Sequence, residues 1–183
     1  VGNGGRILPR NVPTVFNTAL QFAQHYGGNR VDVEAQAEEA LASKLAYGNP
    51  DIATAEKKLR AIPGYRPLFE KAFPGEAEPV NAKNCGLAIG AYERTLLTPA
   101  PFDRYLKGDT SAISEKAKRG LDKFINTGCA GCHGGVVLGG QMYQKFGLTQ
   151  AYWTMTCSVE QPLLGGRDRG RFHDTDNGAE DWM

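Results

Sequence analysis

The sequence predicts a mainly α fold, and three observations support this prediction. Apolar residues recur at intervals of three and four in several segments, which is the spacing of one face of an α-helix. These segments begin after Asn, Asp or Ser and end at Gly or Pro, which favour helix starts and stops. Almost no stretch alternates apolar and polar residues as a strand does. With 41% hydrophobic and 22% charged residues, the 183-residue chain can bury a core.

Five helices are expected in the first half of the chain. The first begins at Asn11 and Pro13 and carries an apolar stripe that ends before Gly27-Gly28. Asp32 is expected to cap the second helix, and Asn49, followed by a proline, the third. The expected ranges are 13–26, 33–47, 50–62, 67–73 and 82–96. Asn81 should cap the last of these, whose apolar face is formed by Cys85, Ala88, Ile89, Tyr92 and Leu96.

Two prolines, Pro99 and Pro101, mark the expected domain boundary. Prolines at this spacing end a helix and stiffen the link that follows it. We therefore predict one helical domain over residues 1–98 and a second over residues 99–183. In the second domain a short helix is expected at 102–106, and Ser114 should cap a longer one. The inward residues of that helix would be Ala117, Leu121, Phe124 and Ile125, and an extended, glycine-rich segment is expected from 134 to 140.

The run Cys129-Ala130-Gly131-Cys132-His133 indicates the cofactor of the second domain. Two cysteines separated by two residues, with a histidine directly after them, form the attachment signature of haem c. Each thiol forms a thioether with a haem vinyl group, and the histidine becomes the proximal iron ligand. A thioredoxin-like dithiol or a zinc site would need a βαβ setting or a second Cys/His pair, and the sequence has neither. The motif therefore predicts a haem c bound covalently in the second domain.

The ligand on the opposite side of the iron decides what such a haem can do. A Met or His there gives an electron-transfer centre, whereas an open position permits peroxide or oxygen chemistry. Met142 and Met155 are both within reach of the iron, because an extended segment of nine residues spans about 30 Å. Packing against haem or core is the competing interpretation for each. We expect His25 at a helix end or on the surface, and His173 facing solvent.

Other polar residues and the overall composition limit the function classes. The arginines at 167, 169 and 171 are expected in a solvated turn with Asp168 and Asp174 as local partners, and haem propionates are the alternative partners. A net charge of +1 gives no bulk field for nucleic acid or an anionic membrane, and no apolar run approaches a membrane span. Because haem c is attached outside the bacterial cytoplasm, the motif implies export. Cys85 is expected to be a buried free thiol, with a disulfide to Cys157 as the alternative.

Several stretches together resemble the bacterial dihaem cytochrome c peroxidase family, over nearly the whole chain and in the family's order. They are Pro9-Arg10-Asn11-Val12-Pro13-Thr14-Val15-Phe16-Asn17, Leu59-Arg60-Ala61-Ile62-Pro63-Gly64-Tyr65, Tyr92-Glu93-Arg94-Thr95-Leu96, Pro101-Phe102-Asp103-Arg104-Tyr105-Leu106, Lys118-Arg119-Gly120-Leu121, and the haem motif followed by Leu138-Gly139-Gly140-Gln141-Met142-Tyr143. The resemblance implies cytochrome-c-like helical domains around covalently bound haem c, with residues 1–98 resembling the peroxidatic-haem domain without its haem motif. One haem would be peroxidatic and the other would accept electrons, and the motif at 129–133 matches the second. The resemblance also implies reduction of hydrogen peroxide in the periplasm, a small cytochrome c or copper protein as electron donor, and a homodimer.

The resemblance also assigns expected roles to single residues. Asn11 matches a contributor to an interdomain calcium site, and Tyr26 falls where the family commonly has a Trp between the two haems. Gln36 matches a glutamine near the peroxidatic haem. The sequence departs from the family at Asn3, where a histidine ligand is usual, and at Ala46, where a catalytic glutamate is usual.

Two readings of the chain follow from these departures. The family's first haem motif is expected before residue 1, and its methionine ligand to the second haem beyond residue 183, so the chain would be part of a dihaem enzyme. The alternative is a monohaem electron-transfer cytochrome c without peroxidase activity. A haem protein that oxidises another protein or senses a gas is a third hypothesis, because a fold alone does not define a function.

Overall fold

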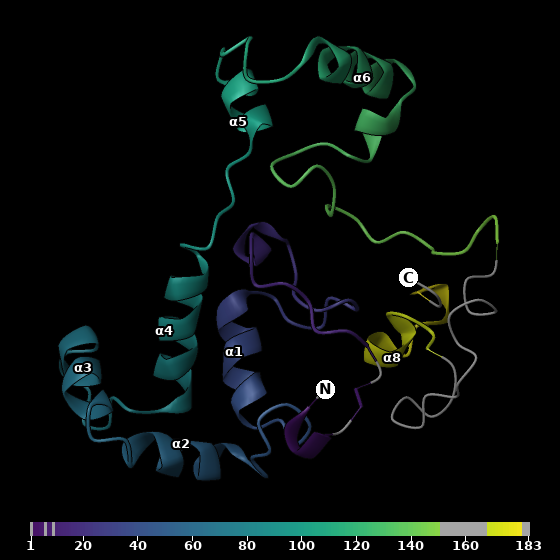
Figure 1. Ribbon diagram of the computed structural model, residues 1–183. Coiled ribbons are helices and arrows are strands. Elements are labelled where there is room, and N and C mark those ends of the chain that lie inside the picture. Colours follow the sequence, from purple (N-terminus) through teal and green to yellow (C-terminus); the bar gives the residue numbers. More distant parts are fainter. Residues whose placement is uncertain (1, 6, 9, 151–167, 181–183) are drawn as a thin grey trace.

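A computed structural model describes residues 2–5, 7–8, 10–150 and 168–180 and confirms the mainly α prediction (Figure 1). Helices and turns make up these residues, and the only β-type pairing among them is an isolated bridge between Gln24 and Arg30. The α-helices are α1 (Val33–Leu41), α2 (Ile52–Arg60), α3 (Tyr65–Ala72), α4 (Ala82–Glu93), α5 (Pro101–Leu106), α6 (Glu115–Asn126) and α8 (Phe172–Thr175). Short 3-10 helices span Asn3–Gly5, Thr18–Leu20, Cys129–Gly131 and Gly178–Glu180.

Three helix starts lie where the capping residues predict them. The side chains of Asp32, Asn81 and Ser114 each accept a hydrogen bond from the backbone N–H three residues later, at 2.8, 2.8 and 3.2 Å. Such a bond satisfies one of the amide groups that a helix start leaves without an intrahelical partner. These local signals therefore fix the starts of α1, α4 and α6, although α1 ends at Leu41 and not near residue 47 as expected.

The cap predicted for the third helix is wrong by two residues. Asp51, not Asn49, caps α2, and its carboxylate accepts from the Thr54 N–H at 2.7 Å. Asn49 is buried instead, where its side-chain amide donates to the Leu41 carbonyl and its side-chain oxygen accepts from Lys58. Asn49 thus ties the end of α1 to α2, which is a tertiary role that its sequence position does not indicate.

The helix predicted at residues 13–26 is also wrong, since only the 3-10 turn Thr18–Leu20 forms there. Asn17 and His25 have φ angles of 59° and 67°, which an α-helix does not allow. A bonded loop replaces the helix: Thr18 and Gln24 are both buried and hydrogen-bonded to each other through their side chains. The larger residues of the apolar stripe are consequently exposed, with Phe16 at 53% of its full accessibility.

The hydrophobic core lies in the first half of the chain, between α1, α2 and α4. Leu41, Ala55, Ala82 and Cys85 form its buried centre, and the Cys85 thiol is free, as predicted. The apolar face predicted for α4 is only partly correct, because Tyr92 is 65% exposed and Ala88 is also exposed. Glycines take their place in the contact with α1.

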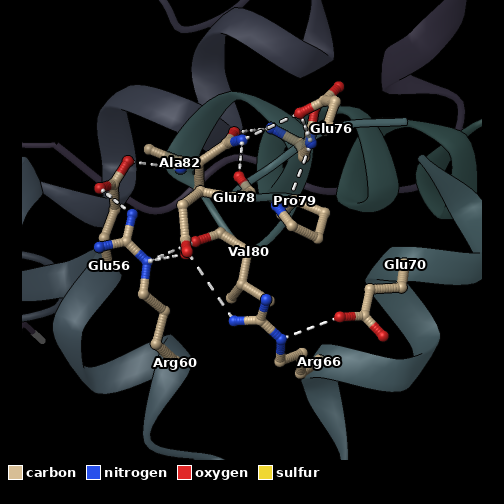
Figure 2. Close-up of polar contacts among 11 residues, drawn as sticks. Glu56, Arg60, Arg66, Glu70, Glu76, Glu78, Pro79, Val80 and Ala82 are labelled. Carbon is tan, nitrogen blue, oxygen red and sulfur yellow. Dashed lines mark hydrogen bonds and ion pairs between the residues drawn. The ribbon is translucent and has the colours of Figure 1, made fainter. Parts of the chain in front are cut away.

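A polar network fixes the loop that leads from α3 into α4 (Figure 2). Glu56 of α2 accepts from the Ala82 N–H at the start of α4 and from the Arg60 guanidinium. Arg60 also donates to the Val80 carbonyl at 2.9 Å. The Asn84 side chain donates to Glu76 and to the Pro79 carbonyl. Because these bonds join α2 to the start of α4 and to the loop before it, they fix the position of α4 relative to α2.

The second half extends from α4 along a segment that leads to α5 and α6 and then returns toward the first half (Figure 1). Residues 96–98 stay attached to the N-terminal loop, where Asn17 bonds with both Leu96 and Thr98. At the other end, α8 lies beside the segment of residues 10–30. The boundary at residues 98/99 remains a prediction.

Candidate haem site

The candidate haem-attachment loop begins where α6 ends. Gly128 has a φ of 85° and turns the chain out of the helix into the 3-10 turn Cys129–Gly131. The backbone N–H groups of Cys132 and His133 both donate to the Cys129 carbonyl, at 3.2 and 2.9 Å. Both thiols are free and exposed. The loop therefore presents two exposed sulfurs and the histidine within one hydrogen-bonded turn, as double thioether attachment requires.

The His133 ring is oriented by one hydrogen bond. Its Nδ1 lies 3.1 Å from the Leu138 carbonyl oxygen. Since a carbonyl only accepts, Nδ1 carries the proton, and Nε2 is left with the lone pair that a haem iron needs. A ligand histidine commonly donates its second ring N–H to such an acceptor, which fixes its tautomer. The arrangement fits a proximal ligand.

The segment after the motif is folded, not extended as predicted. The Leu138 and Gly139 N–H groups donate to the Gly135 and Gly134 carbonyls, and Leu138 has a φ of 53°. A Cβ at Gly139 would lie 3.2 Å from the His133 Nδ1. These turns place the Leu138 carbonyl within hydrogen-bond distance of the imidazole. The glycines at 134, 135 and 139 therefore help to orient His133.

Apolar side chains lie exposed beside the motif. On α6, Leu121 and Phe124 are half-buried and Ile125 is 54% exposed, although all were predicted to face inward. The Phe124 ring meets the His133 ring at a centroid distance of 6.1 Å. Val136 and Leu138 are exposed as well. A macrocycle attached at the two thiols has apolar faces that this surface can cover, so the residues present fit haem c.

A cavity of about 410 Å³ lies next to His133 and has walls from two distant parts of the chain. One wall comes from residues 21–28 and includes His25 and Tyr26. The other comes from residues 133–143 and includes Met142 and Tyr143. The volume is in the range of small-molecule and cofactor sites. The structure thus brings Tyr26, predicted from the family pattern alone, to the cavity that His133 lines.

Only one of the two methionines predicted as sixth ligands, Met142, lies among the described residues. Met142 lines the cavity with His133, is 48% exposed, and its sulfur accepts from the Gln144 amide at 2.9 Å. Met155 lies outside the described residues, as do Met183, Cys157 and Arg167. Met142 as sixth ligand therefore stays a prediction with a favourable location.

Gln36 is not brought to this cavity. It is half-buried in the middle of α1, and it is absent from the residues that line the cavity beside His133. Neighbouring Glu39 forms an ion pair with Arg30. The role of Gln36 near a peroxidatic haem remains a prediction.

Asn11 lies at a second, smaller cavity of about 180 Å³, together with Asn29 and Asp174. Arg10 also lines it, and a guanidinium beside the oxygen donors opposes a cation. Among the described residues no group of three or more His, Cys, Asp or Glu side chains could hold a metal ion. The role of Asn11 at a calcium site stays a prediction.

Sequence reasoning missed the segment of residues 168–174, which docks on the cavity walls. Asp168 forms an ion pair with Arg10 at 2.6 Å. Burial alone would raise the pKa of the Asp168 carboxyl, but the hydrogen bonds from Arg10 and the Gly170 N–H outweigh burial and hold the pKa below its usual range. His173 is not solvent-facing as predicted, since it accepts from the Arg169 N–H at 2.7 Å and its side chain is 18% exposed. Arg171 is likewise not in a solvated turn.

A helical chain with a Cys-Ala-Gly-Cys-His loop, exposed thiols and an oriented histidine has the features of a c-type haem protein. The comparisons make this class specific: the family model for di-haem cytochrome c peroxidase matches residues 1–111, and the chain belongs to this family of oxidoreductases. Family membership implies covalently bound haem c. The match ends before the attachment loop, but relatives cover that region too.

Several named relatives are similar over most of the chain. Cytochrome c551 peroxidase of Pseudomonas aeruginosa is 40% identical over 100% of this chain and 51% of its own length. Cytochrome c551 peroxidase of Nitrosomonas europaea is 35% identical over 93% of this chain and 51% of its own. Methylamine utilization protein MauG of Methylorubrum extorquens is 41% identical over 73% of this chain and 38% of its own length. The chain spans about half the length of the first two.

In the described part of the chain, no helix is long and apolar enough to cross a membrane.

Proposed function

We propose that this chain belongs to a periplasmic di-haem enzyme that reduces hydrogen peroxide, and that its own haem is the electron-entry centre. Each peroxide would take two electrons and two protons and yield two water molecules. A small cytochrome c or copper protein would supply the electrons. The observation that carries the proposal is the cavity shared by His133 and Tyr26, in a chain 40% identical to a cytochrome c551 peroxidase.

The residues at the attachment loop have distinct proposed roles. Cys129 and Cys132 would hold haem c through thioether bonds, and His133 would ligate the iron through Nε2 while Nδ1–H donates to the Leu138 carbonyl. Haem c supplies a one-electron redox centre when bound there. Among the described residues Met142 is the candidate sixth ligand, because it lines the cavity beside His133. The rival candidates are Met155 and the methionine that the family pattern places beyond residue 183. A methionine in this position raises the reduction potential, which suits a haem that accepts electrons.

The N-terminal wall would serve the path out of this haem. Tyr26 lines both cavities, and its 57% exposure leaves the ring open to a group on its other side. We propose that Tyr26 lies between this haem and a second haem c of the complete protein. Gln36 would then face the peroxidatic haem, and Asn11 would contribute to an interdomain calcium ion. These assignments rest on the family pattern.

The decisive experiment is a haem count on the natural protein combined with peroxide turnover. A pyridine haemochrome assay with intact mass should give two haems in a chain longer than this one, and reduced cytochrome c should be oxidised when hydrogen peroxide is added. One haem and no peroxide-dependent oxidation would overturn the proposal in favour of a monohaem electron carrier. Replacing Met142 or Met155 singly by Ala tests the sixth ligand, because a surviving sulfur-to-iron absorption band excludes the residue replaced.

A further inference from the structure

The two walls of the cavity beside His133 come from segments more than a hundred residues apart, and Arg171 contacts both of them. Its Nη1 donates to the Gly27 carbonyl at 2.5 Å and lies 3.4 Å from the Gly28 carbonyl. Its guanidinium carbon lies 4.2 Å from the centre of the Tyr143 ring. Gly27 and Gly28 directly follow Tyr26, and Tyr143 directly follows Met142.

The N-terminal turn is pressed against its neighbours so tightly that only glycine fits. A Cβ at Gly28 would overlap the Tyr143 hydroxyl, and the φ of Gly28 is 64°. A Cβ at Gly27 would overlap the Asp174 carboxylate. Such close approach of backbone to side chain is possible where a residue has no Cβ. The position of the Tyr26 turn is therefore set by the segments that touch these two glycines.

Tyr143 is fixed from two sides. The Phe22 ring packs against it in a T-shaped arrangement at a centroid distance of 5.1 Å, and the Arg171 guanidinium lies over its face. A guanidinium can donate from its edge while its plane stacks on an aromatic ring, whereas a lysine ammonium has no plane to stack. Arg171 uses both capacities, one on each wall of the cavity.

We propose that Arg171 is a positioning residue that sets the separation of the Tyr26 turn from the Met142–Tyr143 segment, and through it the surroundings of the haem iron. The proposal rests on the proposed function only in that haem c is bound at residues 129–133. Arg171 itself touches neither His133 nor Met142 in the contacts described above. It acts through the Gly27–Gly28 carbonyls and the Tyr143 ring.

The test uses the haem-loaded natural protein and the variants Arg171→Gln, Arg171→Lys and Tyr143→Leu. A redox titration followed by the visible spectrum measures the midpoint potential and axial-ligand bands of this haem, and thermal unfolding is recorded beside it. Arg171→Gln should shift the potential and alter the ligand bands, and Arg171→Lys should restore part of the shift, because lysine keeps one hydrogen bond. Arg66→Gln is the control, since Arg66 pairs with Glu70 on α3 (Figure 2) and should leave both readouts unchanged.

The double variant Arg171→Gln with Tyr143→Leu separates positioning from a general loss of stability. If Arg171 acts through Tyr143, the two shifts in potential should be less than additive. A lower melting temperature with an unchanged potential and spectrum would overturn the proposal. If Arg171→Gln does not fold, Arg171→Lys and Tyr143→Leu decide in the same way. If the unmutated protein does not turn over peroxide, the proposed function is overturned, but this inference about Arg171 is not affected.

Discussion

At the scale of single residues, the tautomer of His133 is set by the Leu138 carbonyl, and this makes a direct prediction. His133→Ala should keep the haem through its two thioethers but change the visible spectrum and shift the midpoint potential by on the order of 0.1 V or more. Added imidazole should restore much of the spectrum. His25→Ala is the comparison, because His25 lines the same cavity but bonds to Asn29. A changed spectrum in His25→Ala and none in His133→Ala would exchange their roles.

Glu93 is a buried carboxyl with a predictable effect on stability. It lies on α4 with 8% exposure, and burial first, then the negative charge of Glu34, raise its pKa. The native state therefore holds this proton more tightly than the unfolded chain does. The resulting stability is present below the unfolded-state pKa and is lost as pH rises through the folded pKa. At neutral pH the buried charge of Glu93 consequently lowers the free energy of unfolding.

We predict that Glu93→Gln increases the free energy of unfolding at neutral pH by on the order of 1 kcal/mol. The gain should disappear as pH falls below the usual range of a glutamate. Chemical denaturation at several pH values measures it. Glu70→Gln is the control, because Glu70 is exposed and pairs with Arg66 on the surface of α3, where an ion pair contributes little. A pH-independent change in Glu93→Gln would show that the carboxyl charge is not the cause.

At the scale of helices, the contact between α1 and α4 depends on glycines. A Cβ at Gly86 would lie 2.8 Å from the Glu34 backbone oxygen, and one at Gly90 would lie 2.5 Å from a Glu34 side-chain oxygen. Glu34 is held in place by two 2.9 Å bonds from Arg94, and the Arg94 hydrogen bond lowers the pKa of Glu34. The two helices therefore approach each other as closely as the backbone permits.

Gly86→Ala should destabilise the protein by about 1–3 kcal/mol, because the new methyl group meets a backbone atom that cannot rotate away. Helix propensity alone would make the same change favourable by about 1 kcal/mol. Ala88→Gly, at an exposed position of α4, calibrates that propensity term in the same helix. Thermal or urea unfolding of both variants decides: a stabilising Gly86→Ala would mean that the helices separate at little cost.

The helices also show what could be predicted from sequence. Asp32, Asn81 and Ser114 act within three residues of their own position, so composition and spacing were sufficient to predict the starts of three helices. The apolar stripe before Gly27 has helical spacing, but the left-handed backbone at Asn17 and the buried Thr18–Gln24 pair override it. Spacing records which side chains could share a face. It does not record which backbone conformation tertiary contacts select.

At the scale of the whole molecule, the candidate haem-attachment motif can be recognised from the sequence, whereas the contacts around it cannot. The order Cys129, Cys132, His133 is local and chemically specific, so the sequence alone identifies it. The contacts that frame the cavity join distant residues, such as Arg10 with Asp168 and Arg171 with Gly27. No pattern within a short window indicates such pairs. Charge alone suggested local Asp partners for the arginines, and the fold supplied carbonyls and an aromatic ring.

The distribution of buried apolar residues leads to a prediction about the two halves. Among the described residues, the fully buried hydrophobic side chains all lie between Val33 and Cys85. The part from α5 to residue 150 has an apolar face on α6 but no buried apolar centre. In the natural protein this half should therefore depend on its haem for a core, as small domains with little buried area depend on a bound group.

Replacing Cys129 and Cys132 by Ser should remove covalent haem and abolish hydrogen-exchange protection in α6 and the loop after it, while α1, α2 and α4 stay protected. Cys85→Ser is the reciprocal variant, because it puts a hydroxyl into the core between these three helices. It should weaken protection there and spare the haem spectrum. If each variant affects its own half, the boundary predicted at 98/99 separates two folding units. If either variant melts both halves together, the ties from residues 168–174 to the N-terminal loop make the molecule one unit.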